Sequence, residues 1–379
     1  MKVRLFKPSL GEEELNNIKK VFEDAWLGMG PRVREFEEAW SRYLGCKISI
    51  AVNSATAALH LALAAFRFKA GKKVLVPVVT FASTATAALY NNLEPIFVDV
   101  DVETLSLSFA DLERKYTKDC VAIIPVHMGG QPVAMDTLLE FARLKHLAVI
   151  EDCAHCAGGM YKGKKLGTWG DIGCFSFEEK KCMTTGDGGM ISSNDEELVA
   201  PLRAHRWLGI DRDTWHRSKG YTDTKSKDAR HWYFEIAVLG YKYNMNDLAA
   251  SIGLAQLKKL DTMNTRRSEC IKRYMDGIKK MKNIQPLLPY EPDIYVYWIF
   301  GIRTQKRDEL ILHLKSKGIA TSVHYMPLTV HPLFKPYDSG CPTAEKIWKT
   351  FITLPLHTEL TNSDVDYIVE ALEQFDRRS

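Results

Sequence analysis

The sequence predicts an α/β fold built on a doubly wound sheet, and three observations lead to this prediction. The chain has 379 residues, which is more than one hydrophobic core usually fills. Over its first half, short apolar runs rich in β-branched residues alternate with helical patterns. These runs are almost continuously apolar, as in the strands of a parallel sheet that helices cover on both faces.

The expected strands of this sheet occur at six places along the chain. They are 48–52, 74–79, 95–100, 121–126, 147–152 and 172–177. Helical patterns follow the first four of these strands, over 55–66, 83–91, 109–116 and 135–146. Such an alternation is typical of parallel strands joined by helical crossovers.

After about residue 250 the pattern changes, which predicts a second and smaller α+β domain. We therefore expect a large α/β domain over 1–250 and a small C-terminal domain over 251–379. The elements expected in this part are a long helix over 246–281, an apolar run over 295–304, a helix over 307–318, a strand over 319–325 and a terminal helix over 361–375. The polar stretch 211–231 is expected to be a mobile surface loop.

Composition and charge favour a soluble protein with neither nucleic acid nor membrane as a partner. Lysine and arginine together number 51 against 47 acidic residues, with no long basic run. The N-terminus lacks the apolar core of a signal peptide. The most apolar stretch, 51–66, contains Asn53, Ser54 and His60 and is shorter than the ~20 residues of a membrane span. These observations predict a cytoplasmic location.

Two of the eight cysteines, Cys153 and Cys156, form a C-x-x-C pair, a spacing found in zinc and redox sites. No second pair and no spaced histidines accompany it, as a zinc site would require. A reactive redox pair usually opens a helix near the first strands, and this pair does not. We therefore expect buried thiols here and no metal site.

Polar residues follow directly after several predicted strands, where ligands bind in open α/β sheets. The first group, Ser54, Ala55 and Thr56, opens a helix, where free N–H groups and the helix dipole favour a phosphate. An ordinary N-cap would explain Ser54 equally well. The second group, Glu151 and Asp152, places carboxylates at a strand end, where each needs a cation, a donor or a capping role.

The third group is Ser176 with Lys180 and Lys181, which lie between an apolar strand and the glycines of 186–189. Surface lysines are common, so neither lysine is significant alone. Together the three groups supply a phosphate cradle, a carboxylate and an amine, which pyridoxal phosphate needs. The carboxylate would keep the pyridine nitrogen protonated, and a partly desolvated lysine would attack the aldehyde carbon. Asp152, Ser176 and Lys181 are the candidates for these roles.

At these residues the chain resembles the DegT/StrS family of pyridoxal-phosphate-dependent sugar aminotransferases, which share the aspartate aminotransferase fold. The similarity runs from residue 10 to 328, through the stretches 149–158 and 170–190 among others. The resemblance implies a mostly parallel seven-stranded sheet flanked by helices in the large domain. It also implies that Lys181, and not Lys180, bonds to the cofactor.

The resemblance assigns further roles to residues of this chain. It places Asp152 at the pyridine nitrogen, His155 near the ring hydroxyl and Phe81 against the ring. Around the phosphate it places Ser54, Ala55, Thr56 and Ser176, together with Lys242 or Asn244 of the partner subunit. Near the substrate it places Trp26, His127, His324 and Tyr325.

The resemblance also implies an activity and an assembly. Lys181 would act as acid and base in moving an amino group from glutamate to the 4-keto or 3-keto group of a nucleotide-linked deoxysugar. The product would be an aminosugar for a surface polysaccharide, such as the O-antigen of lipopolysaccharide, or another glycoconjugate. The enzyme would be a homodimer with shared active sites.

Other functions stay open on the same machinery. A keto-cyclitol such as an inosose could be the acceptor, and a non-catalytic sensor could bind the same cofactor. Related dehydratases carry histidine at the position of Lys181, so a lysine favours transamination. A dinucleotide-binding oxidoreductase is disfavoured because 53–58 lacks G-x-G-x-x-G.

The chain departs from the family pattern at several positions near the expected site. Glu178 and Glu179 replace an aromatic residue or histidine and a proline, and Cys182 replaces an asparagine. Ala55 replaces a glycine. The stretch 240–244 is G-Y-K-Y-N where many members have G-Y-N-Y-R, so either Lys242 or Asn244 could contact the phosphate.

Overall fold

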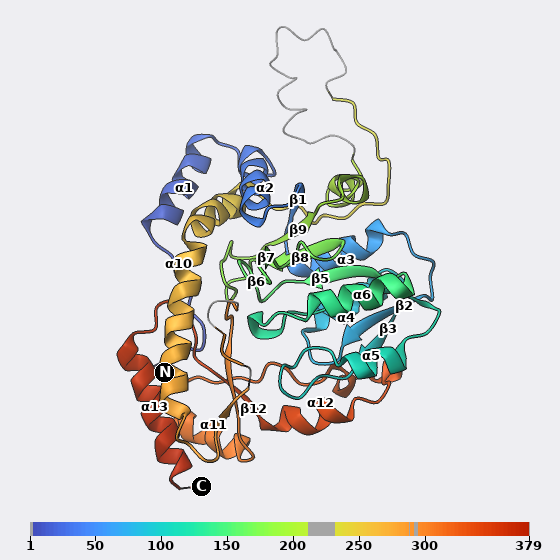
Figure 1. Cartoon of the computed structure of the whole chain (residues 1–379). Helices are drawn as coiled ribbons and strands as arrows, with labels where there is room; N and C mark the ends of the chain where they lie inside the picture. Colours follow the sequence, from blue (N-terminus) through green and yellow to red (C-terminus); the bar gives the residue numbers. More distant parts are fainter. Residues whose placement is uncertain (1–2, 211–231, 288, 292–294, 379) are drawn as a thin grey trace.

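The computed structural model describes residues 3–210, 232–287, 289–291 and 295–378 (Figure 1). A seven-stranded sheet with the order β1-β9-β8-β5-β4-β2-β3 forms the centre of the larger part. Its strands are β1 (Ile48–Val52), β2 (Lys73–Pro77), β3 (Glu94–Val98), β4 (Cys120–Ile123), β5 (Ala148–Asp152), β8 (Ile172–Ser176) and β9 (Gly189–Ser193). The neighbours from β8 to β3 pair in parallel, and β9 runs antiparallel to both β1 and β8. The expected mostly parallel seven-stranded sheet is confirmed.

Helices cover both faces of this sheet. One core contains apolar side chains of α2 (Pro31–Leu44), α6 (Met135–Lys145) and the first half of α10 (Asp247–Ile278). The core on the other face contains side chains of α3 (Ala55–Ala65) and α4 (Ala82–Tyr90). The remaining elements of this part are α1 (Glu12–Glu23), α5 (Phe109–Lys115), η1 (Met128–Gly130), β6 (Met160–Tyr161), β7 (Lys164–Lys165), α7 (Glu196–Val199) and α8 (Leu202–His205).

A third core lies in the C-terminal part of the chain. A three-stranded sheet has the order β10-β11-β12, and its strands are β10 (Gln285–Pro286), β11 (Phe300–Arg303) and β12 (Phe351–Leu354). It packs with α11 (Arg307–Ser316), α13 (Asn362–Asp376) and the second half of α10. The short elements η2 (Leu328–Val330), η3 (Lys335–Tyr337), α12 (Pro342–Ile347) and η4 (Trp348–Thr350) lie between them in the chain.

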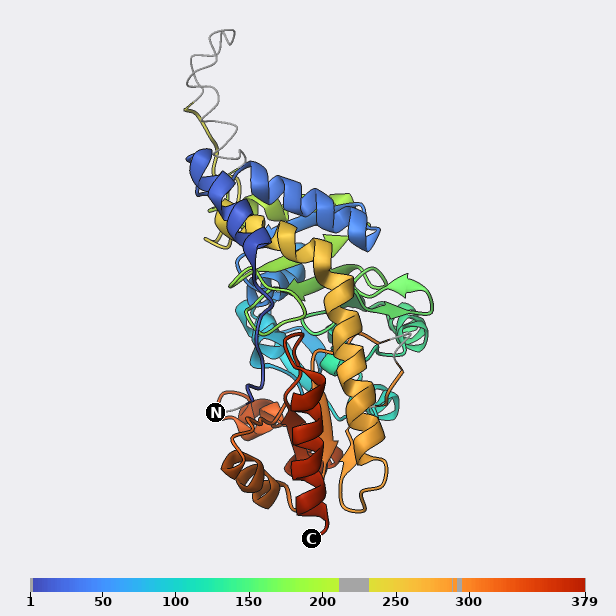
Figure 2. The same ribbon diagram turned by 90° about the vertical axis from the view of Figure 1, so that its left-hand side faces the viewer.

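Helix α10 connects the two parts of the molecule. It has 32 residues, and Figure 2 shows it running the length of one side with α13 beside its C-terminal half. Asn246 caps its first turn by accepting a 2.8 Å hydrogen bond from the Ala249 N–H. The expected domain boundary between residues 250 and 251 falls inside α10, so that division stays a prediction.

Most expected elements of the second half are present, with one exception. Segment 319–325 forms no strand and makes only single bridges, Ile319 to Val3 and Ser322 to Thr353. The expected loop 211–231 lies outside the described residues. Among the helices that the structure describes, none has the combination of length and apolar character that crossing a membrane requires.

Candidate active site

A cavity of about 350 Å³ opens at the carboxyl ends of the parallel strands, between the two parts of the molecule. Most of the predicted site residues line it: Ser54, Ala55, Thr56, Phe81, Asp152, His155, Ser176, Lys181, His324 and Tyr325. They come from segments between β1 and residue 325, which the fold brings together. The cavity therefore lies where ligands usually bind in open α/β sheets.

The start of α3 forms one end of the cavity. The Ser54 hydroxyl accepts a 3.1 Å hydrogen bond from the Ala57 N–H, and Thr56 and Ser83 share a 2.7 Å hydroxyl contact. Strand β9 approaches this helix start closely, because a Cβ at Gly189 would lie 2.5 Å from the Ser54 carbonyl carbon. Hydroxyl groups, a helix N-terminus and a close backbone together suit a phosphate group.

Asp152 lies at the floor of the cavity and is buried. Its Oδ2 accepts a 2.8 Å hydrogen bond from the Thr84 hydroxyl, and its Oδ1 accepts a 3.1 Å bond from the Ala154 N–H. Burial raises the pKa of Asp152 above its ordinary value, while these two bonds and the charge of Lys181 oppose that rise. A carboxylate in this position can bind a protonated ring nitrogen.

Lys181 points its amine into the same cavity. Its Nζ lies 3.8 Å from the centroid of the Trp298 ring. Burial lowers the pKa of Lys181 to about 8, against the raising effect of Glu178 and Asp152. An amine with this pKa is partly neutral near pH 7, which a nucleophile or a base requires. Lys180 is exposed and lies 3.5 Å from a Glu178 oxygen.

His155 is buried and electrically neutral. Burial lowers its pKa well below the ordinary value, and the nearby charge of Lys181 adds to this effect. Its Nδ1 accepts a 3.4 Å hydrogen bond from the Gly129 N–H, which leaves the proton on Nε2, 3.3 Å from the Tyr325 hydroxyl. The indole of Trp298 stacks on the imidazole at 3.8 Å between ring centroids.

His324, Tyr325 and Phe81 also line the cavity. Burial lowers the pKa of His324 to about 4 and raises that of Tyr325 above its ordinary value. The Nδ1 of His324 lies 3.0 Å from the Thr353 hydroxyl. Phe81 is 58% exposed, with its ring 6.0 Å from that of Tyr325. An exposed aromatic ring at the cavity entrance is available to stack on a flat ligand.

Four predicted residues lie outside the lining of this cavity. Trp26 donates its indole N–H to the Met29 carbonyl at 3.2 Å. His127 is fully buried, with its Nε2 3.1 Å from Glu151 and its Nδ1 accepting from the Val133 N–H. Lys242 lies over the Trp207 ring, and its Nζ donates to Asn244 at 3.0 Å. The roles expected for these four residues stay predictions.

Glu151 and the C-x-x-C pair have structural environments. The Glu151 carboxylate accepts hydrogen bonds from the backbone N–H groups of 167, 169 and 170, which holds that turn. Cys153 and Cys156 lie with His127 in a group whose ligand atoms are within 4.8 Å of one another. Both thiols are buried and free, and burial raises the pKa of each. Because both His127 nitrogens are already hydrogen-bonded, the group offers no free imidazole.

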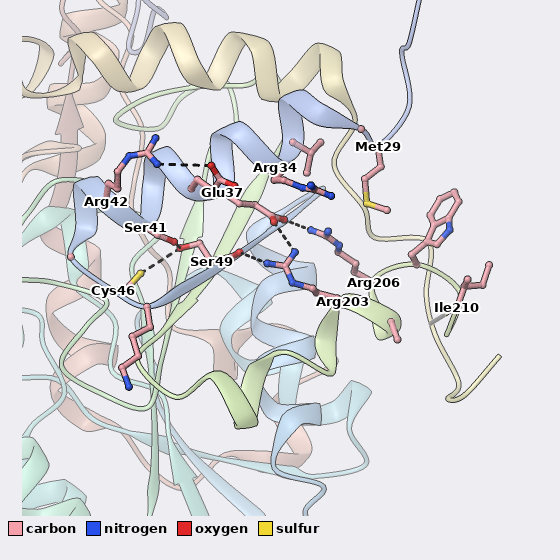
Figure 3. A pocket seen from close by; sticks show the side chains of 17 residues that line it. Met29, Arg34, Glu37, Ser41, Arg42, Cys46, Ser49, Arg203, Arg206 and Ile210 are labelled. Carbon is pink, nitrogen blue, oxygen red and sulfur yellow. Dashed lines mark hydrogen bonds and ion pairs between the residues drawn. The ribbon is translucent and has the colours of Figure 1, made fainter. Parts of the chain in front are cut away.

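A larger cavity of about 720 Å³ lies elsewhere, between α2, β1 and α8 (Figure 3). None of the predicted site residues lines it. Its central carboxylate, Glu37, is already paired with Arg203 at 2.7 Å and with Arg206. Arg42 at its edge lies 3.9 Å from Glu38. We therefore interpret the charged side chains of this cavity as structural ion pairs.

The sequence did not single out two side chains that touch the site. Trp298 lies within the apolar run 295–304, and no feature of that run separates a ligand-contacting indole from a packed one. Thr84 lies within a helical pattern, where a threonine gives no sign of a functional role. The available clue was the spacing of Thr80 and Thr84, which lie four residues apart just after a strand end. Their hydroxyl groups share a 2.8 Å contact.

The residues of the smaller cavity fit pyridoxal phosphate. Ser54, Thr56 and Ser176 would hold its phosphate, Asp152 its pyridine nitrogen and Lys181 its aldehyde carbon. The fit rests on three observations: the close approach of β9 to the helix start, the buried carboxylate that is not ion-paired by the described residues, and the desolvated amine.

Comparison with known proteins agrees with this fit. The model of the DegT/DnrJ/EryC1/StrS aminotransferase family matches residues 8–373. The chain is 39% identical to the uncharacterized protein MJ1066 of Methanocaldococcus jannaschii, over 97% of this chain and 96% of that protein. It is 35% identical to the spore coat polysaccharide biosynthesis protein SpsC of Bacillus subtilis, over 96% of this chain and 95% of that protein.

A solved structure shows the same similarity in three dimensions. The PLP form of Spr1654 from Streptococcus pneumoniae superposes with a TM-score of 0.90 at 27% identity, over 100% of this chain and 99% of that chain. The chain therefore belongs to the DegT/DnrJ/EryC1/StrS aminotransferase family and is a pyridoxal-phosphate-dependent aminotransferase.

Proposed function

We propose that the protein moves an amino group from glutamate to a 4-keto or 3-keto group of a nucleotide-linked deoxysugar. The product is an aminosugar for a surface polysaccharide or another glycoconjugate. The observation that carries the amino-transfer chemistry is the meeting of Lys181, Asp152 and the start of α3 in one cavity. The similarity to SpsC, a polysaccharide biosynthesis protein, supports a sugar acceptor.

The residues of the chain divide the work of this reaction. When bound, pyridoxal phosphate supplies an electron sink that weakens the bonds at the carbon bearing the amino group. Asp152 holds a proton on the ring nitrogen, and the hydroxyls at the start of α3 hold the phosphate. Lys181, in its neutral form, would move a proton from the donor carbon to the carbon of the cofactor that carried the aldehyde. In the second half of the reaction it would move a proton from that carbon to the sugar carbon that receives the amino group. The neutral His155 would lie near the ring hydroxyl and could donate a hydrogen bond to it.

We further propose that two copies of the chain share their active sites. Lys242 and Asn244 do not line the cavity of their own chain, in agreement with a contact to the partner's cofactor phosphate. The nearby apolar residues Trp232, Ile236 and Leu239 are 58%, 71% and 83% exposed. Large apolar side chains exposed within one short segment are typical of a surface that binds another molecule.

The proposed function is tested in two half-reactions. The purified protein loaded with pyridoxal phosphate should lose its visible absorbance band on addition of glutamate, and a Lys181→Ala variant should not. The aminated protein is then offered a nucleotide-linked 4-keto sugar, the 3-keto isomer and a keto-inositol. Return of the band with a keto sugar supports the proposal. If the band returns only with the keto-inositol, the acceptor is a cyclitol and not a sugar. If glutamate does not remove the band, glutamate is not the amino donor.

A further inference from the structure

The backbone around Lys181 is held from outside its own loop. Within the loop between β8 and β9, the Lys181 N–H donates to the Glu178 carbonyl at 2.9 Å and the Lys180 N–H donates to the Glu178 carboxylate at 3.0 Å. The carbonyl groups before and after Lys181 are bound by two distant side chains. The indole Nε1–H of Trp298 donates to the Lys180 carbonyl at 2.8 Å, and Nη2 of Arg267 donates to the Cys182 carbonyl at 2.8 Å.

Arg267 is a buried cation that faces carbonyl and amide oxygens. It lies on α10 and is 7% exposed. Its Nη1 donates to Asn264 at 3.0 Å, and Asn264 in turn donates to the Ala157 carbonyl at 3.0 Å. Among the described residues, no carboxylate forms an ion pair with it. A buried guanidinium without a carboxylate is costly, so its hydrogen bonds must be well placed to compensate.

Trp298 is also held in place by contacts with residues outside the Lys181 loop. It is 3% exposed, and its backbone N–H donates to the Gly129 carbonyl at 2.9 Å. Its ring stacks on His155 and lies nearly parallel to Phe6, at 5.6 Å between centroids. The same ring lies 3.8 Å from the Lys181 Nζ. The indole therefore contacts the amine with its face while its N–H holds the peptide before it.

We propose that Arg267 and Trp298 are positioning residues that fix Lys181 by binding the two carbonyl groups on either side of it. This inference rests on the proposed role of Lys181 as the amine that bonds to the cofactor. A lysine side chain has four rotatable bonds, so its amine reaches a given point reliably only if its backbone is fixed. The loop's own backbone bonds, from Phe177 to Gly188 and from Thr185 to Phe177, hold its base. Two side chains, one from α10 and one from the approach to β11, hold the carbonyl groups next to Lys181.

The structure also offers matched controls for both residues. Arg266, the next residue on α10, makes the same kind of bond, to the Leu360 carbonyl at 2.6 Å and to Asn362, away from the cavity. Trp169 donates its indole N–H to the Lys164 carbonyl at 3.3 Å in the β6–β7 hairpin region. Arg267→Met and Trp298→Phe remove the proposed bonds, and Arg266→Met and Trp169→Phe remove equivalent bonds elsewhere.

The experiment measures amide hydrogen exchange in the apoprotein, so that it needs neither cofactor nor activity. We expect Arg267→Met and Trp298→Phe to accelerate exchange in peptides covering 178–185 by about tenfold or more, as for a locally opened segment. Exchange in a reference peptide from α6 should stay unchanged, as should exchange over 178–185 in both control variants. Arg267→Lys, which keeps a charged donor, should restore part of the protection and decides the question if Arg267→Met does not fold.

A second measurement follows the effect on the reaction. In the loaded enzymes, the rate constant of the glutamate half-reaction should fall by about 10- to 100-fold while glutamate affinity changes little, since misplacing a reacting group costs rate. Unchanged exchange over 178–185 in both Arg267→Met and Trp298→Phe overturns the proposal, as does an equal acceleration over the whole chain. If borohydride labels another residue in the wild-type enzyme, the assignment of Lys181 fails, whereas the exchange result still reports on the two bonds.

Discussion

The Thr84 hydroxyl donates a 2.8 Å hydrogen bond to Oδ2 of the buried Asp152. This bond stabilises the charged form of a carboxyl group whose pKa burial raises. Helix α4 therefore contributes directly to the charge state of the residue expected to bind the pyridine nitrogen. Through this bond the charge of Asp152 depends on Thr84, which does not itself line the cavity.

Thr84→Val should weaken cofactor binding without disturbing the fold, because valine has the same shape and lacks the hydroxyl. A hydrogen bond to a charged group contributes about 1.5–3 kcal/mol, so we expect affinity for pyridoxal phosphate to fall by about tenfold or more. Titration of the apoprotein measures this. Thr86→Val on the same helix, where the hydroxyl only contacts the Ser83 carbonyl, should leave affinity unchanged. Equal affinities for the two variants contradict the role of Thr84.

The reaction of Lys181 with the cofactor should depend on pH with a single upward limb. Because burial lowers its pKa to about 8, the amine becomes neutral as pH rises through that value. The rate of covalent cofactor binding to the apoprotein should increase about tenfold per pH unit well below 8 and level off above it. Stopped-flow absorbance from pH 6 upward measures the limb. A rate that keeps rising through pH 10 shows that Lys181 is not desolvated.

Gly189→Ala should impair phosphate binding through steric contact alone. The added methyl would lie 2.5 Å from the Ser54 carbonyl and 2.7 Å from the Ala55 nitrogen, so β9 or the start of α3 must move. We expect cofactor affinity to fall by about tenfold, in line with the cost of overpacking a close contact. Gly28→Ala, where a Cβ meets nothing within 4 Å, is the control. Calorimetric titration with inorganic phosphate and with the cofactor should show the same ranking of variants.

Of the carboxylates that line the larger cavity, Glu37 should contribute most to the free energy of unfolding. It accepts from the Ala51 N–H at 2.9 Å and pairs with Arg203 and Arg206. Burial tends to raise the pKa of Glu37, but the charges of Arg206 and Arg203 hold it below the ordinary value. Its contribution is therefore present above the ordinary pKa of 4.5 and is lost as pH falls through the lower folded value.

Glu37→Leu should accordingly destabilise the protein by about 3–5 kcal/mol, because it leaves the buried Arg206 without its partner. Glu38→Leu at the exposed edge of the same cavity removes only the 3.9 Å contact with Arg42 and should change stability by less than about 1 kcal/mol. Denaturant unfolding at pH 7 compares the two variants. Similar losses for both would show that the Glu37 pairs contribute no more than surface contacts.

Sequence patterns predicted the sheet well because six of its strands are mostly apolar, with their charged residues at the strand ends, as Glu151 and Asp152 are in β5. Strand β9 was not among them: Gly-Met-Ile-Ser-Ser is buried but has only two large apolar residues, and its burial comes from its position between β1 and β8. The strand expected over 319–325 failed for the opposite reason. Its apolar residues pack singly against other segments, as Ile319 does beside Val3, without forming a ladder.

The site was predictable where function depends on residues next to strand ends. Asp152, Ser176 and Lys181 were predicted in this way, and all three line one cavity, while their roles stay predictions. Trp298 and Arg267 could not be found, since each reaches the Lys181 loop from more than eighty residues away in the chain. A buried aromatic and a helical arginine have many structural uses, and only the folded structure shows which carbonyl group each one binds.

The central claim is that the amine of Lys181 bonds to pyridoxal phosphate. Borohydride reduction of the loaded enzyme, followed by proteolysis and mass spectrometry, measures this directly. We predict that the cofactor mass is found on Lys181 in the peptide that joins β8 to β9. Its attachment to the neighbouring Lys180 or to any other lysine, or the absence of labelled peptide, contradicts the account.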